Sequence, residues 1–116
     1  MKPWDVWQWE FPHGSHPAVI VSPKDRCANP DIATVNVLGC STQRARRKPE
    51  LHEVLLDRED GLEWETLCRC DVLFLAKKSE LTYRRGALTY ERQRQLGQKI
   101  IRLFGLWLGN RRGEPK

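Results

Sequence analysis

Residues 61–71 read GLEWETLCRCD and form the most informative stretch of the chain. Their composition favours a strand, which we expect over residues 66–75, either continuous or interrupted by a short turn. Successive side chains of a strand point to opposite faces, so Arg69 and Asp71 share one face while the two cysteines that flank Arg69 share the other. The stretch therefore predicts a polar pair on the surface above a pair of buried thiols.

Further short strands are predicted on the N-terminal side of this stretch. The sequence DVWQWEF alternates apolar and mixed positions, which predicts a strand at Asp5–Phe11 with Trp7 and Trp9 on its apolar face. Residues 18–21 are rich in β-branched side chains, which predicts a strand buried on both faces. A loop is expected around residues 29–31. Two more strands are expected at residues 32–40 and 51–56, and a polar connection at residues 79–89.

The last element has a different periodicity. From Leu96 onward, apolar side chains recur at i, i+4, i+7 and i+8, which is the stripe of an amphipathic helix. Thr89 suits the N-cap and Gly109 the stop of a helix at about residues 89–108. Two glycines inside this helix cost about 1 kcal/mol each relative to alanine. We expect close packing against the sheet to explain both of them, Gly97 and Gly105.

Together these elements predict a mainly β domain with a C-terminal helix, built as a small barrel or sandwich. The 116 residues make one ordinary domain. We expect it at residues 1–109, followed by a frayed basic tail at residues 110–116. No apolar run approaches the roughly 20 residues of a membrane-spanning helix, and the N-terminus has no apolar signal core. We therefore expect a cytoplasmic protein that does not cross a membrane.

The chain is basic, which favours an anionic partner such as RNA, DNA or an acidic polypeptide. It has 20 Lys and Arg against 15 Asp and Glu, a formal charge of +5. Cations concentrate in a predicted solvated loop that could contact phosphates, and the hydroxyl and amide groups before it could bind phosphate oxygens or base edges. Tryptophans such as Trp4 and Trp64 could stack on unpaired bases. The candidate RNA-binding residues are Ser41, Thr42, Gln43, Arg44, Arg46, Arg47 and Lys48.

The four cysteines leave two interpretations open. Nothing in the sequence indicates export, which disfavours a disulfide framework. The favoured interpretation is small, buried, apolar side chains. The other is a four-cysteine zinc site, which would require the first two cysteines to converge on the C-x-C pair. We expect neither a metal nor a cofactor. The cysteines are Cys27, Cys40, Cys68 and Cys70.

Catalytic chemistry on a phosphodiester is the sharper interpretation of the polar pair. Arg69 could bind phosphate and stabilise charge in the transition state, while Asp71 could take a proton from an attacking hydroxyl. His13 and His16, in a Gly/Pro turn, could supply a general acid. Such parts suit RNA cleavage without a metal, with the ribose 2′-hydroxyl as nucleophile. The plainer alternatives are a surface ion pair and two solvated histidines.

These motifs together resemble the MazF/PemK (Kid-like) toxin family of bacterial type II toxin–antitoxin systems. The R-C-D sequence within residues 61–71 is the most specific part of the resemblance. It extends over nearly the whole chain, from about residue 5 to residue 109. The other similar stretches are DVWQWEF at Asp5–Phe11, HPAVIVSP at residues 16–23, VNVLGCSTQ at residues 35–43, and residues 88–108.

The resemblance implies an SH3-like β-barrel with a C-terminal helix, usually as a homodimer. It implies a metal-independent endoribonuclease that cuts single-stranded RNA, and an antitoxin whose acidic tail covers the RNA groove. The family's catalytic arginine and aspartate correspond to Arg69 and Asp71, and its histidine to His16 or His13. The family's hydroxyl at the end of a strand corresponds to Ser41 or Thr42.

The sequence differs from the family pattern at its first loop. Most members have G-x-E-Q-x-G-x-R-P there, whereas this chain has only Gly14, Ser15, His16 and Pro17. The shortened loop motivates an alternative, a non-catalytic MazF/PemK-like module that binds nucleic acid or protein. A purely structural partner of another protein is a third possibility.

Overall fold

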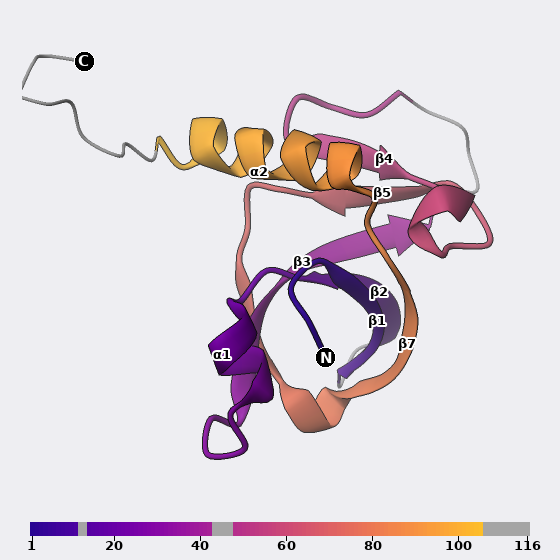
Figure 1. Cartoon of the computed structure of the whole chain (residues 1–116). Helices are drawn as coiled ribbons and strands as arrows, with labels where there is room; N and C mark the ends of the chain where they lie inside the picture. The colour runs from indigo at the N-terminus through magenta and orange to yellow at the C-terminus, as the bar shows by residue number, and fades with distance from the viewer. Residues whose placement is uncertain (12–13, 43–47, 106–116) are drawn as a thin grey trace, which may run out of the picture.

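The computed structural model describes residues 1–11, 14–42 and 48–105, in which seven strands build one curved antiparallel sheet (Figure 1). A single long helix follows the last strand. The strands are β1 (Asp5–Phe11), β2 (Gly14–Ile20), β3 (Thr34–Thr42), β4 (Glu53–Leu56), β5 (Thr66–Arg69), β6 (Phe74–Lys77) and β7 (Leu81–Ala87). The helices are α1 (Lys24–Ala28), η1 (Arg58–Asp60), η2 (Lys78–Glu80) and α2 (Tyr90–Leu103).

The long strand β3 joins two parts of this sheet. The strand order is β4-β5-β3-β2-β1-β7, and β6 also pairs with β3. The first half of β3, from Thr34 to Val37, pairs with β6, whereas its end, from Cys40 to Thr42, pairs with β5. Strands β1, β2 and β7 curl around one part of the molecule, while β4 and β5 lie next to α2 (Figure 1). The end of β5 and the start of β6 are thereby brought together along the middle of β3.

The expected mainly β domain with a C-terminal helix is confirmed, and so is the strand at Asp5–Phe11. The region expected at residues 66–75 contains two strands, β5 and β6, separated by a turn. The strand expected at residues 32–40 starts and ends later, as β3. The five-residue helix α1 precedes the loop at residues 29–31.

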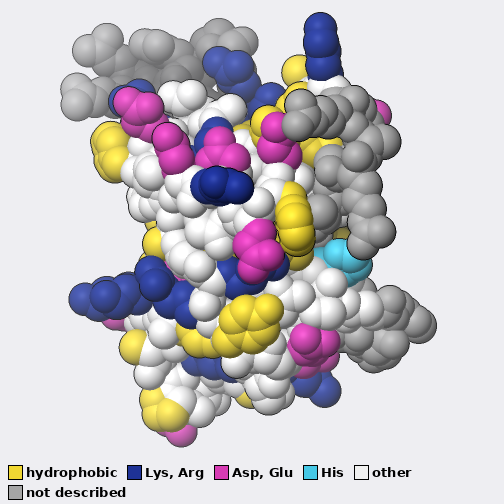
Figure 2. Space-filling model, turned by 90° about the vertical axis from the view of Figure 1, so that its right-hand side faces the viewer, with side chains coloured by type: hydrophobic (Ala, Val, Ile, Leu, Met, Phe, Trp, Pro, Cys, Tyr) yellow, Lys and Arg dark blue, Asp and Glu magenta, His cyan; other side chains and the backbone are white. Residues whose placement is uncertain are grey.

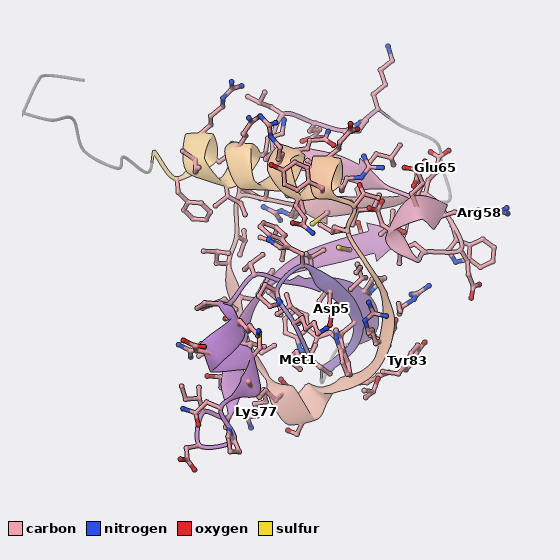
Figure 3. All side chains as sticks on the ribbon, in the orientation of Figure 1. Met1, Asp5, Arg58, Glu65, Lys77 and Tyr83 are labelled. Carbon is pink, nitrogen blue, oxygen red and sulfur yellow. The ribbon has the colours of Figure 1, made fainter. Side chains whose placement is uncertain are left out.

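The expectation of a polar connection at residues 79–89 is wrong. Residues Leu81–Ala87 form β7, which pairs antiparallel with β1 from Trp9↔Leu81 to Asp5↔Ala87. β7 lies at the end of the strand order, and several of its side chains, including Tyr83, are exposed and point outward (Figure 3). Only Leu81 of β7 is buried, and the three side chains that follow it are all exposed. The strand therefore lacks the alternation of a half-buried strand, and its sequence resembles a loop.

The C-terminal helix begins as expected and ends earlier. The Thr89 side chain accepts a hydrogen bond from the Arg92 backbone N–H at 3.2 Å, which confirms the N-cap. The helix ends at Leu103, and Gly105 has φ of 62°, so the stop is Gly105 rather than Gly109. The packing explanation for Gly97 is also wrong, because a Cβ there would meet no atom within 4 Å. Residues beyond 105 lie outside the described part of the chain.

Both faces of the curved sheet are buried, in two separate apolar clusters. Val6, Val19 and Leu38 belong to the cluster that also contains Leu96 of α2. Trp9, Ala18 and Ile20 belong to the other cluster, which β1, β2 and β7 curve around. The alternation of residues 18–20 between the clusters confirms burial on both faces. The strand begins earlier than expected, at Gly14, so His16 lies in β2 and its expected place in a turn is wrong.

The cysteines are distributed between these two clusters. Cys40, Cys68 and Cys70 lie in the α2 cluster, whereas Cys27 lies in the other. All four are free and buried. Because Cys27 does not join the remaining three, the four-cysteine zinc site is wrong and the apolar interpretation is confirmed. None of the helices in the described ranges is long and apolar enough to span a membrane.

A buried ion pair holds α2 against the sheet. The Asp60 side chain is 0% exposed, and its two oxygens accept hydrogen bonds from Arg92 Nε at 3.2 and 3.3 Å. The backbones of Gly61 and Gly86 are in close contact beside this ion pair. A Cβ on Gly86 would lie 2.7 Å from both the Gly61 Cα and the Asp60 carbonyl oxygen. Gly61 also has φ of 89°, which favours glycine. These contacts set the position of α2 over the β4–β5 part of the sheet.

Candidate active site

The predicted polar pair is present at the end of β5. Arg69 Nε donates a hydrogen bond to Asp71 Oδ1 at 3.0 Å, and Arg69 Nη2 donates to Asp71 Oδ2 at 2.8 Å. Cys68 and Cys70 are 0% exposed on the opposite face, whereas the Arg69 side chain is half exposed. The alternation inferred from the sequence is therefore confirmed. Two parallel bonds fix the plane of the guanidinium and leave its outer edge open to solvent.

The pair alters the acid–base properties of both partners. The hydrogen bonds from Arg69 lower the pKa of Asp71, and the positive charge of Arg69 contributes to the same shift. The Asp71 carboxylate in turn raises the pKa of Arg69, with smaller contributions from Glu53 and Glu50. Asp71 is thus an anion at neutral pH, and Arg69 is held as a cation at a defined position.

Arg69 borders a cavity of about 390 Å³ at the junction of five strands. His16 from β2 and Ser41 from β3 provide the other polar side chains of its lining. Trp9 from β1 and Phe74 from β6 provide an aromatic wall, completed by Gly39 and Cys40 of β3. The cavity therefore combines a fixed cation, a histidine and a hydroxyl with a largely apolar surface.

Strand pairing in the first hairpin sets the position of His16, and side-chain hydrogen bonds stabilise the residues beside it. His16 lies opposite Trp9 in the pairing of β1 with β2. On the neighbouring positions, Gln8 is buried and donates from its amide to Ser15 Oγ, while Arg85 Nη1 donates to Gln8 Oε1 at 3.0 Å. Pairing continues to Phe11↔Gly14, so only residues 12–13 connect the two strands. The hairpin is thus anchored close to its tip.

The other predicted site residues are distributed as follows. Ser41 reaches the cavity, whereas Lys48 borders a different and larger hollow of about 650 Å³ between the β4 region and α2. Thr42 pairs through its backbone with Thr66. Trp64 is 59% exposed, while Trp4 packs against the α2 cluster. His13, Gln43, Arg44, Arg46 and Arg47 lie outside the described residues.

Two features of the site were missed in the sequence. The first is the aromatic wall: the strand expected at residues 66–75 gives Phe74 no role, and only the pairing of β6 with β3 places it beside Arg69. The second is a group formed by Glu50, His52 and Glu53, whose ligand atoms lie within 4.8 Å of one another and which could hold a cation. Its signal in the sequence is the local run ELHE at residues 50–53, and the pairing of β4 with β5 then places Glu53 opposite Arg69.

Charge on the described surface is mixed. On the face seen in Figure 2, Lys and Arg side chains alternate with acidic and apolar ones and do not gather into one large positive area. The cations and carboxylates of the described ranges are equal in number, so the excess positive charge of the chain lies on residues outside those ranges. Recognition of an anion by the described residues therefore depends on individual cations in fixed positions, such as Arg69.

Comparison with known proteins relates this geometry to solved structures. No family model matches the sequence, and no curated protein matches it. An endoribonuclease in complex with its cognate antitoxin from a mycobacterial species is 20% identical with a TM-score of 0.78, covering 92% of this chain and 97% of that one. The Mycobacterium tuberculosis toxin MazF-mt6 is 19% identical with a TM-score of 0.74, covering 89% and 98%.

A MazE–MazF structure from Deinococcus radiodurans is 18% identical with a TM-score of 0.72, and the match covers 92% of this chain and 97% of that one. The likeness thus extends over nearly the full length of each of these proteins. It includes the barrel-like sheet and the closing helix that the sequence resemblance implied. At this level of identity the likeness establishes the fold, and the chain has the fold of the MazF toxins.

Proposed function

We propose that this chain is a toxin of the MazF/PemK family and cleaves single-stranded RNA without a metal ion. The observation that carries the proposal is Arg69, held by two hydrogen bonds from its guanidinium to Asp71 at the edge of a cavity that also contains His16 and Ser41. A structural neighbour of the same fold is described as an endoribonuclease in complex with its antitoxin.

The proposed reaction uses the substrate's own 2′-hydroxyl as nucleophile. Attack on the adjacent phosphorus breaks the bond to the 5′ oxygen, which leaves a 2′,3′-cyclic phosphate and a 5′-hydroxyl end. Arg69 stabilises the negative charge of the phosphorane, as preorganised donors do in other phosphoryl and acyl transfers. In this proposal His16, which lines the same cavity, protonates the leaving 5′ oxygen, because histidine exchanges protons near neutral pH.

Asp71 has two connected roles in this proposal. In the free protein its lowered pKa makes it a weak base, so it mainly orients Arg69. A phosphate that shares Arg69 competes for the same guanidinium and weakens its hold on the carboxylate. The basicity of Asp71 then rises, and the carboxylate can accept the proton of the 2′-hydroxyl. His13 is the reserve candidate for the acid.

The RNA strand would continue beyond the cavity. Ser41 and Thr42 are proposed to contact the substrate at the end of β3, with Gln43, Arg44, Arg46, Arg47 and Lys48 following the strand through its phosphates. Such contacts to the backbone position the RNA but do not read its sequence.

Partners of the protein are part of the same proposal. The basic chain would bind an acidic antitoxin, and it would form a homodimer in the cytoplasm. Exposed apolar side chains at the end of α2 and just after it, Ile101 and Phe104, are available for such contacts. A single species at twice the chain mass in light scattering is the expected result for the dimer.

A non-catalytic binding module on the same fold is the second candidate. The observation that favours it is the short first hairpin, in which β1 and β2 pair up to Phe11↔Gly14. No long first loop is available in this sequence to cover the cavity. In that case RNA would bind with a steep dependence on salt and without forming products.

Cleavage of a mixed-sequence single-stranded RNA in EDTA tests the proposal. Wild type should leave cyclic phosphate ends, and Arg69→Ala should reduce the rate about 100- to 1,000-fold. Arg58→Ala is the matched control, since Arg58 is an exposed arginine on η1 (Figure 3). Salt-dependent binding by folded wild type with no cleavage would instead establish the binding module.

A further inference from the structure

The cavity beside Arg69 has an aromatic wall that the cleavage chemistry does not use. We propose that this wall is a subsite for one unpaired nucleobase, which stacks on Phe74 while a phosphate of the same strand binds Arg69. The inference rests on the proposed function and deepens it. It makes Phe74 a residue that determines which part of a substrate strand is held next to the cleavage site.

The two aromatic side chains of the wall differ in freedom. Their ring centroids are 5.5 Å apart and the ring planes are inclined by 59°. Trp9 is only 8% exposed and belongs to the apolar cluster inside the curved sheet, so it is the fixed part of the wall. Phe74 is 39% exposed at the first position of β6. Phe74 therefore offers ring surface to a ligand, and Trp9 supports it from behind.

Gly39 keeps this arrangement open. A Cβ at Gly39 would lie 3.2 Å from Phe74 Cε2 and 3.6 Å from Phe74 Cδ2. The phenyl ring thus lies directly against the backbone of β3, where a larger residue would push it toward the cavity. The backbone φ of Gly39 is not positive, so its conformation does not require a glycine. The close approach of the ring is the physical reason for glycine at this position.

The chemistry of the cavity matches one nucleotide of an unpaired strand. Its volume of about 390 Å³ is in the range of small-molecule sites, and its lining is mostly apolar with Arg69 at one edge. An aromatic ring beside a guanidinium is the combination with which proteins bind single strands, through stacking on the base and a contact to phosphate. A base inside a duplex is already stacked and could not enter.

Binding of a non-cleavable oligonucleotide tests the inference. The probe is a fluorescein-labelled, mixed-sequence RNA with 2′-O-methyl riboses, and fluorescence anisotropy gives its Kd. Phe74→Ala should weaken binding roughly 5- to 150-fold, the range found when a stacking side chain is removed. Phe74→Tyr should bind like wild type, because it keeps the ring. Phe74→Leu, which keeps an apolar side chain without a ring, should bind weakly and covers the case in which the alanine variant fails to fold.

Two controls separate stacking from other effects. Leu75→Ala removes an exposed apolar side chain from the next position of β6, outside the cavity lining, and should leave Kd unchanged. An abasic ribose–phosphate strand of the same length should bind wild type and Phe74→Leu equally. If Phe74→Leu weakens binding of the probe and of the abasic strand equally, Phe74 does not stack on a base. Phe74 would then shape the cavity or contact a peptide partner, and the inference would be overturned.

The outcomes also distinguish this inference from the function on which it rests. If wild type cleaves RNA but Phe74→Leu binds the probe as tightly as wild type, the subsite is wrong and the nuclease stands. If wild type binds the probe without cleaving RNA and Phe74→Leu weakens that binding, the subsite stands without the nuclease. If wild type binds no oligonucleotide at any salt concentration, both are wrong.

Discussion

Replacing Arg92 by alanine is expected to destabilise the protein strongly, although Arg92 does not line the cavity beside Arg69. The change removes the guanidinium that faces Asp60, whose side chain is 0% exposed. It also removes the contact of 3.5 Å between Arg92 Nη2 and Asp57 Oδ2. The Asp60 carboxylate would then be buried with the Asp57 backbone N–H, at 2.9 Å, as its remaining donor.

The size of the effect follows from this burial. Removing one partner of a buried ion pair costs about 3–5 kcal/mol, because the other charge is left uncompensated. The remaining backbone donor and the 19% exposure of Arg92 place the expected loss at the lower end, about 3 kcal/mol. For a domain of this size the midpoint of thermal unfolding should fall by roughly 10 °C. Total stabilities are only about 5–15 kcal/mol, so the loss is a large fraction.

Urea denaturation followed by circular dichroism measures this loss directly. Arg69→Ala is the matched comparison, since Arg69 and Asp71 are 50% and 30% exposed and such pairs contribute about 1 kcal/mol or less. Adding Asp60→Asn to Arg92→Ala should restore part of the stability, because a neutral amide costs less to bury. A loss in Arg92→Ala no larger than that in Arg69→Ala would refute the reasoning.

Two further predictions concern the ion pair of the site and the glycines. In an NMR titration the pKa of Asp71 should lie below its ordinary value and rise toward it in Arg69→Gln. A lowered pKa means that the pair stabilises the fold above the ordinary aspartate pKa and that this contribution disappears as pH falls through the lowered value. An unchanged Asp71 titration in Arg69→Gln would contradict this. Gly86→Ala should lower the free energy of unfolding by roughly 1–3 kcal/mol, since its Cβ would lie 2.7 Å from backbone atoms. Gly97→Ala should instead stabilise α2 by about 0.5–1 kcal/mol, because its Cβ would meet no atom within 4 Å. Equal effects of the two alanines in urea denaturation would show that this difference in space is not what matters.

The parts of the fold that were predicted well are those whose signal is local. Alternation identified β1, and the stripe that begins at Leu96 identified α2 together with its Thr89 cap. β7 was missed because an edge strand with exposed side chains has no local apolar pattern, and its backbone is satisfied by a partner far away in the sequence. The end of α2 was misplaced because either glycine could stop the helix, and only the backbone angle of Gly105 shows which one does.

The candidate site was predictable in part for the same reason. Arg69 and Asp71 are two residues apart, so strand geometry alone placed them on one face and the cysteines beneath them. His16 and Ser41 were candidates from their residue types as well as from the resemblance to MazF/PemK toxins. That they line one cavity with Arg69 could not be inferred, because they come from other strands. Neither the residue types nor the resemblance indicated Phe74.

The sequence by itself determined the periodicity of the main elements, the alternation around Arg69 and the basic character of the chain. These properties depend only on composition and on residues close together in the sequence, so they can be read without knowing which distant residues are in contact. Only the tertiary structure decided that β3 divides its pairing between β5 and β6, which brings Arg69 and Phe74 to one cavity. Strand order and register are set by contacts between distant residues, because each strand can satisfy its backbone hydrogen bonds with many partners and packing of both apolar clusters selects one.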